Sequence, residues 1–352
     1  MAAMEHAGHE VSLASRFRAY DGEGNEALQT KIKRIGCKLG DRLAKRYLTM
    51  PKHARPDVWF TYHVFFKAPD WIGPRVARAL GIPYVVAEAS FAPKREHGNW
   101  QIGYDGTREA IVAADLVLTT NGEDFKCLAP LLKADGLSID LTPFLDTATY
   151  EAAGARRVHH RRALAKTLGV QPDVPLLLTV AMMRPGEKIK SYGVLAEALE
   201  NLRGEEWRLV VAGSGAAEDE VRGMFASLQD RVHWLGLLDT DELPELYAAC
   251  DVFLWPALRE TPGMCFLEAQ AVGTPVIAGR AHGVPSVVAD GETGLLCTVG
   301  DADEFAGAVV RLLGDDALRR TLGKAAANRI PALHGLDLAS RTLDTVLGNL
   351  SI

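Results

Sequence analysis

Two carboxylates lie on either side of an expected helix start in residues 255–278, and their spacing points to ligand binding. Glu260 falls in a polar loop bracketed by two prolines, and Glu268 falls inside the helix that we expect to begin at Gly263. The first amides of a helix lack partners within the helix, and the helix dipole makes this end positive. The stretch therefore suits an anionic ligand whose flanking parts offer hydroxyl groups to the two carboxylates.

The same stretch has the rhythm strand, loop, helix, strand. Residues 251–255 are a short apolar run typical of a buried parallel strand. The helix is predicted to run to about Val272, Gly273 ends it, and residues 275–278 begin the next strand. Ligands of doubly wound sheets bind beyond the carboxyl ends of the strands, which is where this loop and helix start would lie.

The motif Glu260-x7-Glu268, followed by Ala-x-Ala-x-Gly-x-Pro-Val-Ile, resembles the signature of the retaining glycosyltransferases of family 4, which have the GT-B fold. Residues 283–296 resemble the next segment of that signature. The resemblance implies that Glu260 contacts the hydroxyls of the donor sugar and Glu268 the ribose of the nucleotide. It also implies that three consecutive amides face the sugar and diphosphate, those of Gly263, Met264 and Cys265.

A second loop, residues 182–190, carries candidate cations between a predicted strand (176–181) and a predicted helix (191–202). The resemblance implies an arginine and a lysine here that neutralise the leaving diphosphate. Arg184 fits the arginine; Lys190 fits the lysine, and Lys188 is the alternative. Fixed cations stabilise the charge that grows on a departing diphosphate. The alternative interpretation is a loop of solvated cations.

Gly213 and Gly215 follow a strand predicted from residue 207. Glycines here allow close approach of a nucleotide, or only a tight turn. The third glycine of a dinucleotide fingerprint is absent, because Glu218 stands in its place, and this disfavours a nicotinamide oxidoreductase.

His63 and Glu88 lie at the ends of two predicted strands in the first half, 56–63 and 82–90. Glycosyltransferases of this resemblance usually carry an acceptor-side histidine at the end of the second of these strands, whereas this chain has Glu88 followed by Ala89. Either Glu88 or His63 would then take that role. A hydrogen-bonded structural histidine is the alternative for His63. An unpaired buried carboxylate at Glu88 would be costly, which favours a functional role.

The domain organisation follows from the length of 352 residues and from the resemblance. We expect an α/β protein of two Rossmann-like doubly wound domains facing a cleft. Residues 1–146 would form the acceptor-side domain, 147–330 the nucleotide-sugar-binding domain, and 331–352 a helix returning to the first domain. We expect the first strand of the family to be missing, residues 8–15 to form a strand, and residues 141–146 to hold the last strand and the crossover of the first domain.

Composition indicates a cytoplasmic enzyme with no affinity for nucleic acid. The net charge is −6, and the five cysteines are widely spaced, with neither a disulfide framework nor a zinc spacing. No apolar run reaches the ~18 residues needed to span a membrane. The predicted helix 26–48 is basic and amphipathic, so it could contact anionic lipid at the inner membrane face. Its predicted apolar stripe is Leu28, Ile32, Ile35, Leu39, Leu43 and Tyr47, and the alternative is an ordinary solvated helix.

The sequence thus predicts a retaining glycosyltransferase that moves a sugar from a nucleotide diphosphate sugar to an acceptor hydroxyl in glycan, polysaccharide or glycolipid synthesis. No metal or cofactor is expected, because the resemblance gives Arg184, Lys190 and the helix start at Gly263 the role that magnesium has elsewhere. Two alternatives remain open: a sugar-nucleotide-binding protein without catalysis, and a sugar-nucleotide epimerase of the same fold. The donor base, the sugar, the acceptor and the oligomeric state do not follow from the sequence.

Overall fold

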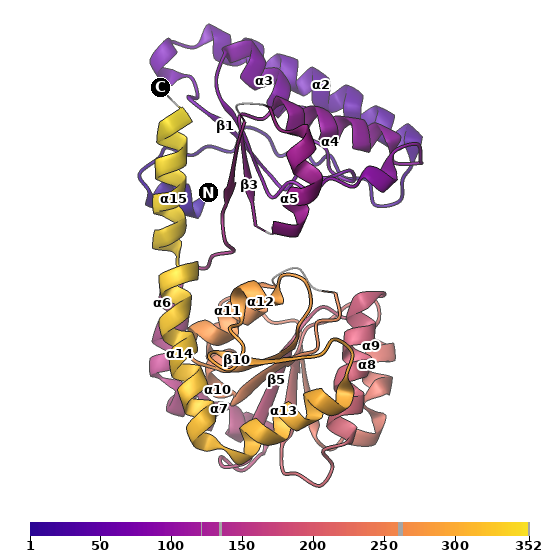
Figure 1. The fold of residues 1–352 in the computed structure, drawn as a ribbon, viewed down its shortest axis with the longest axis vertical. Helices are drawn as coiled ribbons and strands as arrows, with labels where there is room; N and C mark the ends of the chain where they lie inside the picture. The colour runs from indigo at the N-terminus through magenta and orange to yellow at the C-terminus, as the bar shows by residue number, and fades with distance from the viewer. Residues whose placement is uncertain (121, 134–135, 260–262, 351–352) are drawn as a thin grey trace. The chain divides into compact units, whose positions relative to one another are not determined.

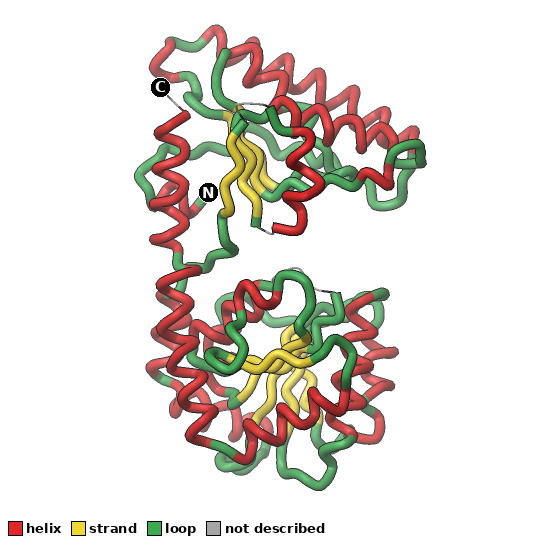
Figure 2. The backbone as a smooth tube through the Cα atoms, in the orientation of Figure 1, coloured by secondary structure: helices red, strands yellow, loops and turns green. Residues whose placement is uncertain are grey.

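The chain folds into two compact units, each built on its own parallel sheet (Figures 1 and 2). The structure is a computed structural model that describes residues 1–120, 122–133, 136–259 and 263–350. Unit 1 comprises Met1–Thr142 together with Ala339–Ile352, and unit 2 comprises Pro143–Leu338. The predicted α/β class is confirmed, with a parallel sheet in each of the two units.

Unit 1 contains a four-stranded sheet in the order β1-β2-β3-β4, with all neighbours parallel. The strands are β1 (Trp59–Tyr62), β2 (Tyr84–Ala87), β3 (Leu116–Thr119) and β4 (Leu137–Asp140). The helices are α1 (Ala2–His6), α2 (Glu26–Thr49), α3 (Gly73–Leu80), α4 (Gln101–Ala113), α5 (Gly122–Leu128) and α15 (Leu336–Leu350), which enters unit 1 at Ala339. Short 3-10 turns span Lys52–Ala54, Pro93–Arg95 and Ala129–Leu131.

Two strand predictions in unit 1 were wrong. Residues 8–15 form no strand, because the alternation there buries no face: Leu13 is 62% exposed. The last strand, β4, precedes the predicted stretch 141–146. Its residues are exposed or half-buried, and β4 lacks the continuous apolar run that made the inner strands recognisable.

The buried face of α2 is rotated from the predicted stripe. The residues that it buries are Gln29, Ile32, Gly36, Gly40, Leu43 and Ala44, whereas Leu28 and Ile35 are exposed. A Cβ on Gly36 would lie 2.7 Å from the Cβ of Trp71, and one on Gly40 would lie 3.3 Å from the Cα of Ile72. The two glycines therefore let α2 pack closely against the segment that leads into α3, and hydropathy alone does not reveal such a face.

Unit 2 contains a six-stranded parallel sheet in the order β10-β9-β8-β5-β6-β7. The strands are β5 (Leu176–Val180), β6 (Arg208–Ala212), β7 (Val232–Gly236), β8 (Val252–Trp255), β9 (Val276–Gly279) and β10 (Gly294–Cys297). The helices are α6 (Ala148–Ala155), α7 (Arg157–Leu168), α8 (Glu187–Glu200), α9 (Glu218–Met224), α10 (Leu243–Ala249), α11 (Met264–Ala271), α12 (Val284–Val287), α13 (Ala302–Gly314) and α14 (Asp316–His334), with a 3-10 turn at Ala226–Leu228.

The strand order of unit 2 reverses direction between β5 and β8. From β5 the chain continues to β6 and β7 on one side, and then returns to β8, β9 and β10 on the other side. Helices α8 and α9 pack together on one face of this sheet, and α10 and α11 pack together on the other (Figure 1). In open parallel sheets such a reversal is the topological switch point, where ligands bind beyond the carboxyl ends of the two strands.

Candidate functional site

Two helices, α8 and α11, follow the two strands at the switch point of unit 2. Strands β5 and β8 are paired through Leu177 with Val252 and Leu178 with Phe253, so their carboxyl ends lie at the same edge. Helix α8 follows β5, and α11 follows β8. The amide of Leu258, in the loop after β8, donates a hydrogen bond to Ser191 Oγ of α8 at 3.2 Å, which links this loop to α8.

The start of α11 lies where the sequence predicted it. Gly263 is the N-cap, with an extended backbone (φ −74°, ψ 135°), and Met264 and Cys265 are the first two helical residues. Their amides belong to the first turn, which offers donors to an anion. Gly273 follows the C-cap with φ +81°, as a helix terminator requires. The predicted sugar ligand Glu260 lies outside the described residues.

The two candidate lysines of α8 have different surroundings in the structure. This helix begins at Glu187, four residues earlier than predicted, so both lysines belong to its first turn. The ammonium of Lys188 lies 5.0 Å from the ring centroid of Trp255, the fully buried last residue of β8. Lys190 is 63% exposed and pairs with Glu187 at 3.0 Å. The geometry favours Lys188 over Lys190 as the cation at the switch point. The other predicted cation, Arg184, is exposed in the loop before the helix.

Glu268 of α11 is held by two tyrosine hydroxyls that the sequence analysis did not find. Tyr247 of α10 donates to Glu268 Oε2 at 2.8 Å, and Tyr150 of α6 also hydrogen-bonds this carboxylate. Burial raises the pKa of Glu268, and the two hydrogen bonds oppose that rise. Burial, followed by the nearby charge of Glu268, raises the pKa of Tyr150, so its hydroxyl remains a donor at neutral pH. No sequence signal links these three residues, which come from three different helices.

Gly213 and Gly215 serve the packing of two loops. Their φ angles are +138° and +157°, which side chains rarely adopt. A Cβ on Gly213 would lie 2.1 Å from the carbonyl oxygen of Ala181, and one on Gly215 would lie 2.2 Å from that of Met183. The loop after β6 therefore lies directly against the loop that carries Arg184. A direct contact of these glycines with a nucleotide stays a prediction.

His63 and Glu88 of unit 1 are hydrogen-bonded to each other. Each follows the last residue of its strand, Tyr62 of β1 and Ala87 of β2. These two last residues are paired in the sheet, so His63 and Glu88 lie next to each other. His63 Nδ1 lies 3.2 Å from Glu88 Oε2, and the hydroxyl of Tyr62 also hydrogen-bonds Glu88. The hydrogen bond to Glu88 raises the pKa of His63. Burial raises the pKa of Glu88, but the hydrogen bonds outweigh it and the net shift is downward. The two residues thus form one hydrogen-bonded pair, which is an ion pair when His63 is protonated.

The backbone at this pair is strained. His63 has φ +63° and Glu88 has φ +56°, although neither is glycine. Each such residue costs on the order of 1 kcal/mol or more and persists only where the surroundings enforce it. Strain at the ends of two adjacent strands, on the two side chains that pair, is typical of a functional site.

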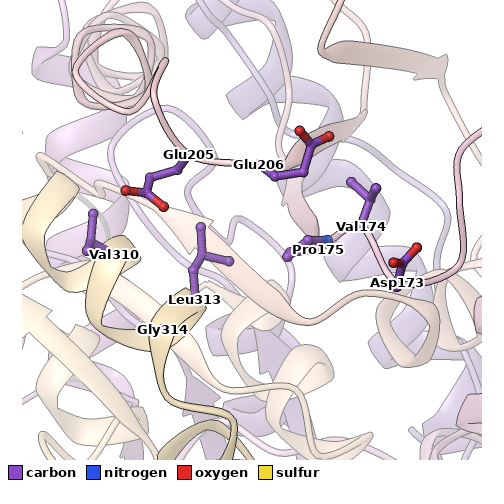
Figure 3. Close-up of a pocket in the computed structure, with 8 residues that line it drawn as sticks. All are labelled: Asp173, Val174, Pro175, Glu205, Glu206, Val310, Leu313 and Gly314. Carbon is purple, nitrogen blue, oxygen red and sulfur yellow. The ribbon is translucent and has the colours of Figure 1, made fainter.

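Two hollows in the described part of the chain lie away from the predicted site residues. One, of about 300 Å³, is lined by Asp173, Glu205 and Glu206 with the apolar residues shown in Figure 3, and it lies near the amino end of β5. Another, of about 790 Å³, adjoins the amino end of β2 in unit 1. Neither contains a predicted site residue. Within the described ranges, no group of three or more His, Cys, Asp or Glu residues is placed to hold a metal ion, and no described helix is long and apolar enough to cross a membrane.

Comparison with known proteins finds a family match within the second unit and relatives that share part of the sequence. Residues 174–315 match the family of glycosyl transferases group 1. The chain is 30% identical over 256 residues to a D-inositol 3-phosphate glycosyltransferase of Stackebrandtia nassauensis, which covers 69% of this chain and 55% of the relative. It is 34% identical over 159 residues to the sulfoquinovosyl transferase of Arabidopsis thaliana, covering 44% of this chain and 30% of the relative. The chain thus spans about half the length or less of these curated relatives.

Solved structures resemble the chain over most of its length. A structure of Anabaena HepE in complex with UDP gives a TM-score of 0.71 at 18% identity, covering 89% of this chain and 82% of that one. Sucrose-phosphate synthase from Thermosynechococcus elongatus gives 0.68 at 22% identity, covering 92% and 79%. The predicted resemblance to group 1 glycosyltransferases with the GT-B fold is confirmed.

Proposed function

We propose that this chain, whose second unit belongs to the glycosyl transferases group 1 family, transfers a sugar from a nucleotide diphosphate sugar to an acceptor hydroxyl with retention at the anomeric carbon. One observation carries the proposal furthest. At the switch point of unit 2, α8 follows β5, α11 follows β8, and Lys188 of α8 lies over Trp255 at the end of β8. This combination would suit a pyrophosphate.

The donor would be bound entirely by unit 2. The amides of Gly263, Met264 and Cys265 would receive the diphosphate, and Lys188 and Arg184 would balance the charge that grows as the bond to the anomeric carbon breaks. Glu268 would bind the ribose and Glu260 the sugar, as the resemblance implies. These groups supply the charge stabilisation that a metal gives elsewhere, so we propose a metal-independent reaction.

The acceptor would be bound by unit 1. We assign the pair of His63 and Glu88 to the acceptor hydroxyl, since the carboxylate can accept a hydrogen bond from it and the imidazole of His63 holds the carboxylate in place. Both side chains are partly exposed, as contact with a substrate requires.

The relatives support a nucleotide donor. Anabaena HepE is described in complex with UDP and with UDP-glucose. Two relatives are named for transfer of a glycosyl or sulfoquinovosyl group. A uridine diphosphate sugar is therefore the first donor to test, and a glycan or lipid-linked alcohol is the acceptor class we propose.

A donor screen tests this function. Purified chain is incubated with uridine, guanosine and adenosine diphosphate sugars, with and without acceptor alcohols, and products are followed by NMR. We expect release of the nucleoside diphosphate and a product that keeps the anomeric configuration of the donor. Binding without turnover would instead favour the non-catalytic alternative, and an isomerised donor without acceptor would favour an epimerase. Inversion would contradict the retaining mechanism.

We further propose that the enzyme works in the cytoplasm and that α2 brings unit 1 to an anionic membrane. The five cysteines, all within the described residues, form no disulfide bond with one another, which fits a reducing compartment. Helix α2 exposes seven cations beside the exposed apolar residues Leu28 (41%) and Ile35 (39%). The cations are Lys31, Lys33, Arg34, Lys38, Arg42, Lys45 and Arg46. Each cation near an anionic surface contributes roughly 1 kcal/mol.

Vesicle sedimentation tests the membrane contact. The wild type should bind vesicles that contain anionic lipid and lose this binding at high salt, because the attraction is electrostatic. A variant with Lys31, Lys38 and Lys45 changed to Gln should bind at least tenfold more weakly and keep its donor affinity. Equal binding of both proteins would leave α2 as a solvated helix.

A further inference from the structure

The hydrogen bonding of Glu268 is unusual for a partly buried carboxylate in a protein interior. Within the part of the chain that the structure describes, the groups that act on its charge are two neutral hydroxyls, those of Tyr150 and Tyr247, and no cation takes part. A buried carboxylate without a cation is normally costly. The arrangement therefore calls for a reason other than stability.

The position of Tyr247 is fixed by its surroundings. The residue is fully buried, its ring packs against Phe253 with centroids 5.7 Å apart, and its carbonyl oxygen accepts a hydrogen bond from Thr274 Oγ1 at 2.8 Å. Tyr150 is also buried, at 8% exposure, and it belongs to α6, which packs against both α10 and α11. Two rigid donors therefore restrain one carboxylate.

We propose that Tyr150 and Tyr247 are positioning residues that orient Glu268 to accept hydrogen bonds from both hydroxyls of a ribose, and that they make the site select ribonucleotides over 2′-deoxyribonucleotides. This inference deepens the proposed function and rests on it. It assigns the two tyrosines a role in substrate choice rather than in the chemical step.

The count of hydrogen bonds supports this role. A carboxylate has about four acceptor positions. The tyrosines occupy two, which leaves two for a vicinal diol. If one tyrosine hydroxyl is removed, the carboxylate can rotate, and it becomes easier to protonate because one stabilising donor is lost. A protonated or misdirected carboxyl group no longer accepts both ribose hydroxyls.

A titration of the full chain with matched nucleotide pairs tests the proposal. The probes are uridine diphosphate and 2′-deoxyuridine diphosphate, with the corresponding guanosine and adenosine pairs, each measured by calorimetry. A hydrogen bond to a charged group contributes about 1.5–3 kcal/mol, so the wild type should prefer the ribonucleotide by roughly tenfold or more. Tyr150→Phe and Tyr247→Phe should each lose most of this preference, with 2′-deoxy affinity changed less than twofold.

The control is Tyr84→Phe. Tyr84 is a buried tyrosine of unit 1 whose hydroxyl donates to Asp70 Oδ2 at 2.8 Å, so it has the same chemistry away from the site. This variant should keep the full ribose preference even if it lowers the melting temperature. If the tyrosine variants of unit 2 fail to fold, Glu268→Gln gives the same readout and should also abolish the preference.

The outcomes separate the inference from the proposed function. If the wild type binds no nucleoside diphosphate, the proposed function and the inference are both overturned. If the wild type binds but Tyr150→Phe and Tyr247→Phe weaken the ribo and deoxy ligands equally, the tyrosines act only through the fold and the inference alone is overturned. Full ribose preference in Glu268→Gln would also overturn it.

Discussion

The two lysines in the first turn of α8 give a sharp test of the diphosphate site. We expect Lys188→Met to lower kcat strongly and Lys190→Met to leave it nearly unchanged. Methionine keeps a long apolar side chain over Trp255, so the substitution removes the charge and preserves most of the packing. Lys190 is the matched control, because it is exposed and already paired with Glu187.

The size of the effect follows from electrostatics. Two unit charges about 4 Å apart interact by about 4 kcal/mol at the effective dielectric near a protein surface. Only part of a unit charge develops on the leaving diphosphate in the transition state, so we take about 3 kcal/mol, which is roughly 10²-fold in kcat. An exposed pair such as Lys190 with Glu187 contributes about 0–1 kcal/mol to stability. Because Lys190 is exposed and already paired, its substitution should change kcat less than twofold.

The assay is steady-state release of the nucleoside diphosphate at saturating donor, with a thermal melt of each variant. Loss of the cation–π contact costs about 0.5–1 kcal/mol, so the melting temperature of Lys188→Met should fall by only a few degrees. The reasoning would be refuted if Lys190→Met lost more activity than Lys188→Met, or if both variants kept wild-type kcat.

Three further predictions concern other parts of the chain. Glu268→Ala should weaken nucleotide binding about tenfold while Glu260→Ala chiefly lowers turnover, and wild-type kinetics in both would contradict the assignment. Gly213→Ala should lower stability by at least 2 kcal/mol in a denaturant titration, because its Cβ would meet a backbone oxygen; an unchanged midpoint would exclude that clash. The His63–Glu88 pair stabilises the fold most between about pH 4.5 and 6.5. The pKa of His63 is raised, so its contribution is lost as the pH rises through that pKa. The pKa of Glu88 is lowered, so its contribution is lost as the pH falls through the pKa of Glu88. His63→Asn tolerates the positive φ and should cost less than about 1 kcal/mol near pH 5.5 and nothing near pH 9, whereas an equal loss at both pH values would argue against an ion pair.

Local signals explain what the sequence predicted well. The strand, loop and helix around Gly263 follow from an apolar run, two prolines and a terminating glycine, and each of these acts within a few residues. The ends of β1 and β2 were also placed closely enough to bring His63 and Glu88 to one edge.

Features that depend on tertiary packing were missed for physical reasons. Successive residues of an α-helix turn by about 100°, so Lys188 and Lys190 point about 200° apart. Only one of them can face the switch point, and the sequence does not show which face of the helix does so. The partners of Glu268 are distant in sequence: Tyr150 lies in a separate helix that no periodicity marked. The buried face of α2 is centred on glycines, which carry no hydrophobic signal.

The central claim is that a nucleoside diphosphate is held between the starts of α8 and α11 at the switch point of unit 2. A crystal structure of the chain with uridine, guanosine or adenosine diphosphate tests it most directly. The account predicts pyrophosphate density within hydrogen-bonding distance of the Gly263 amide and the Lys188 ammonium. Density at the amino end of the sheet, or a diphosphate that contacts neither group, would contradict it.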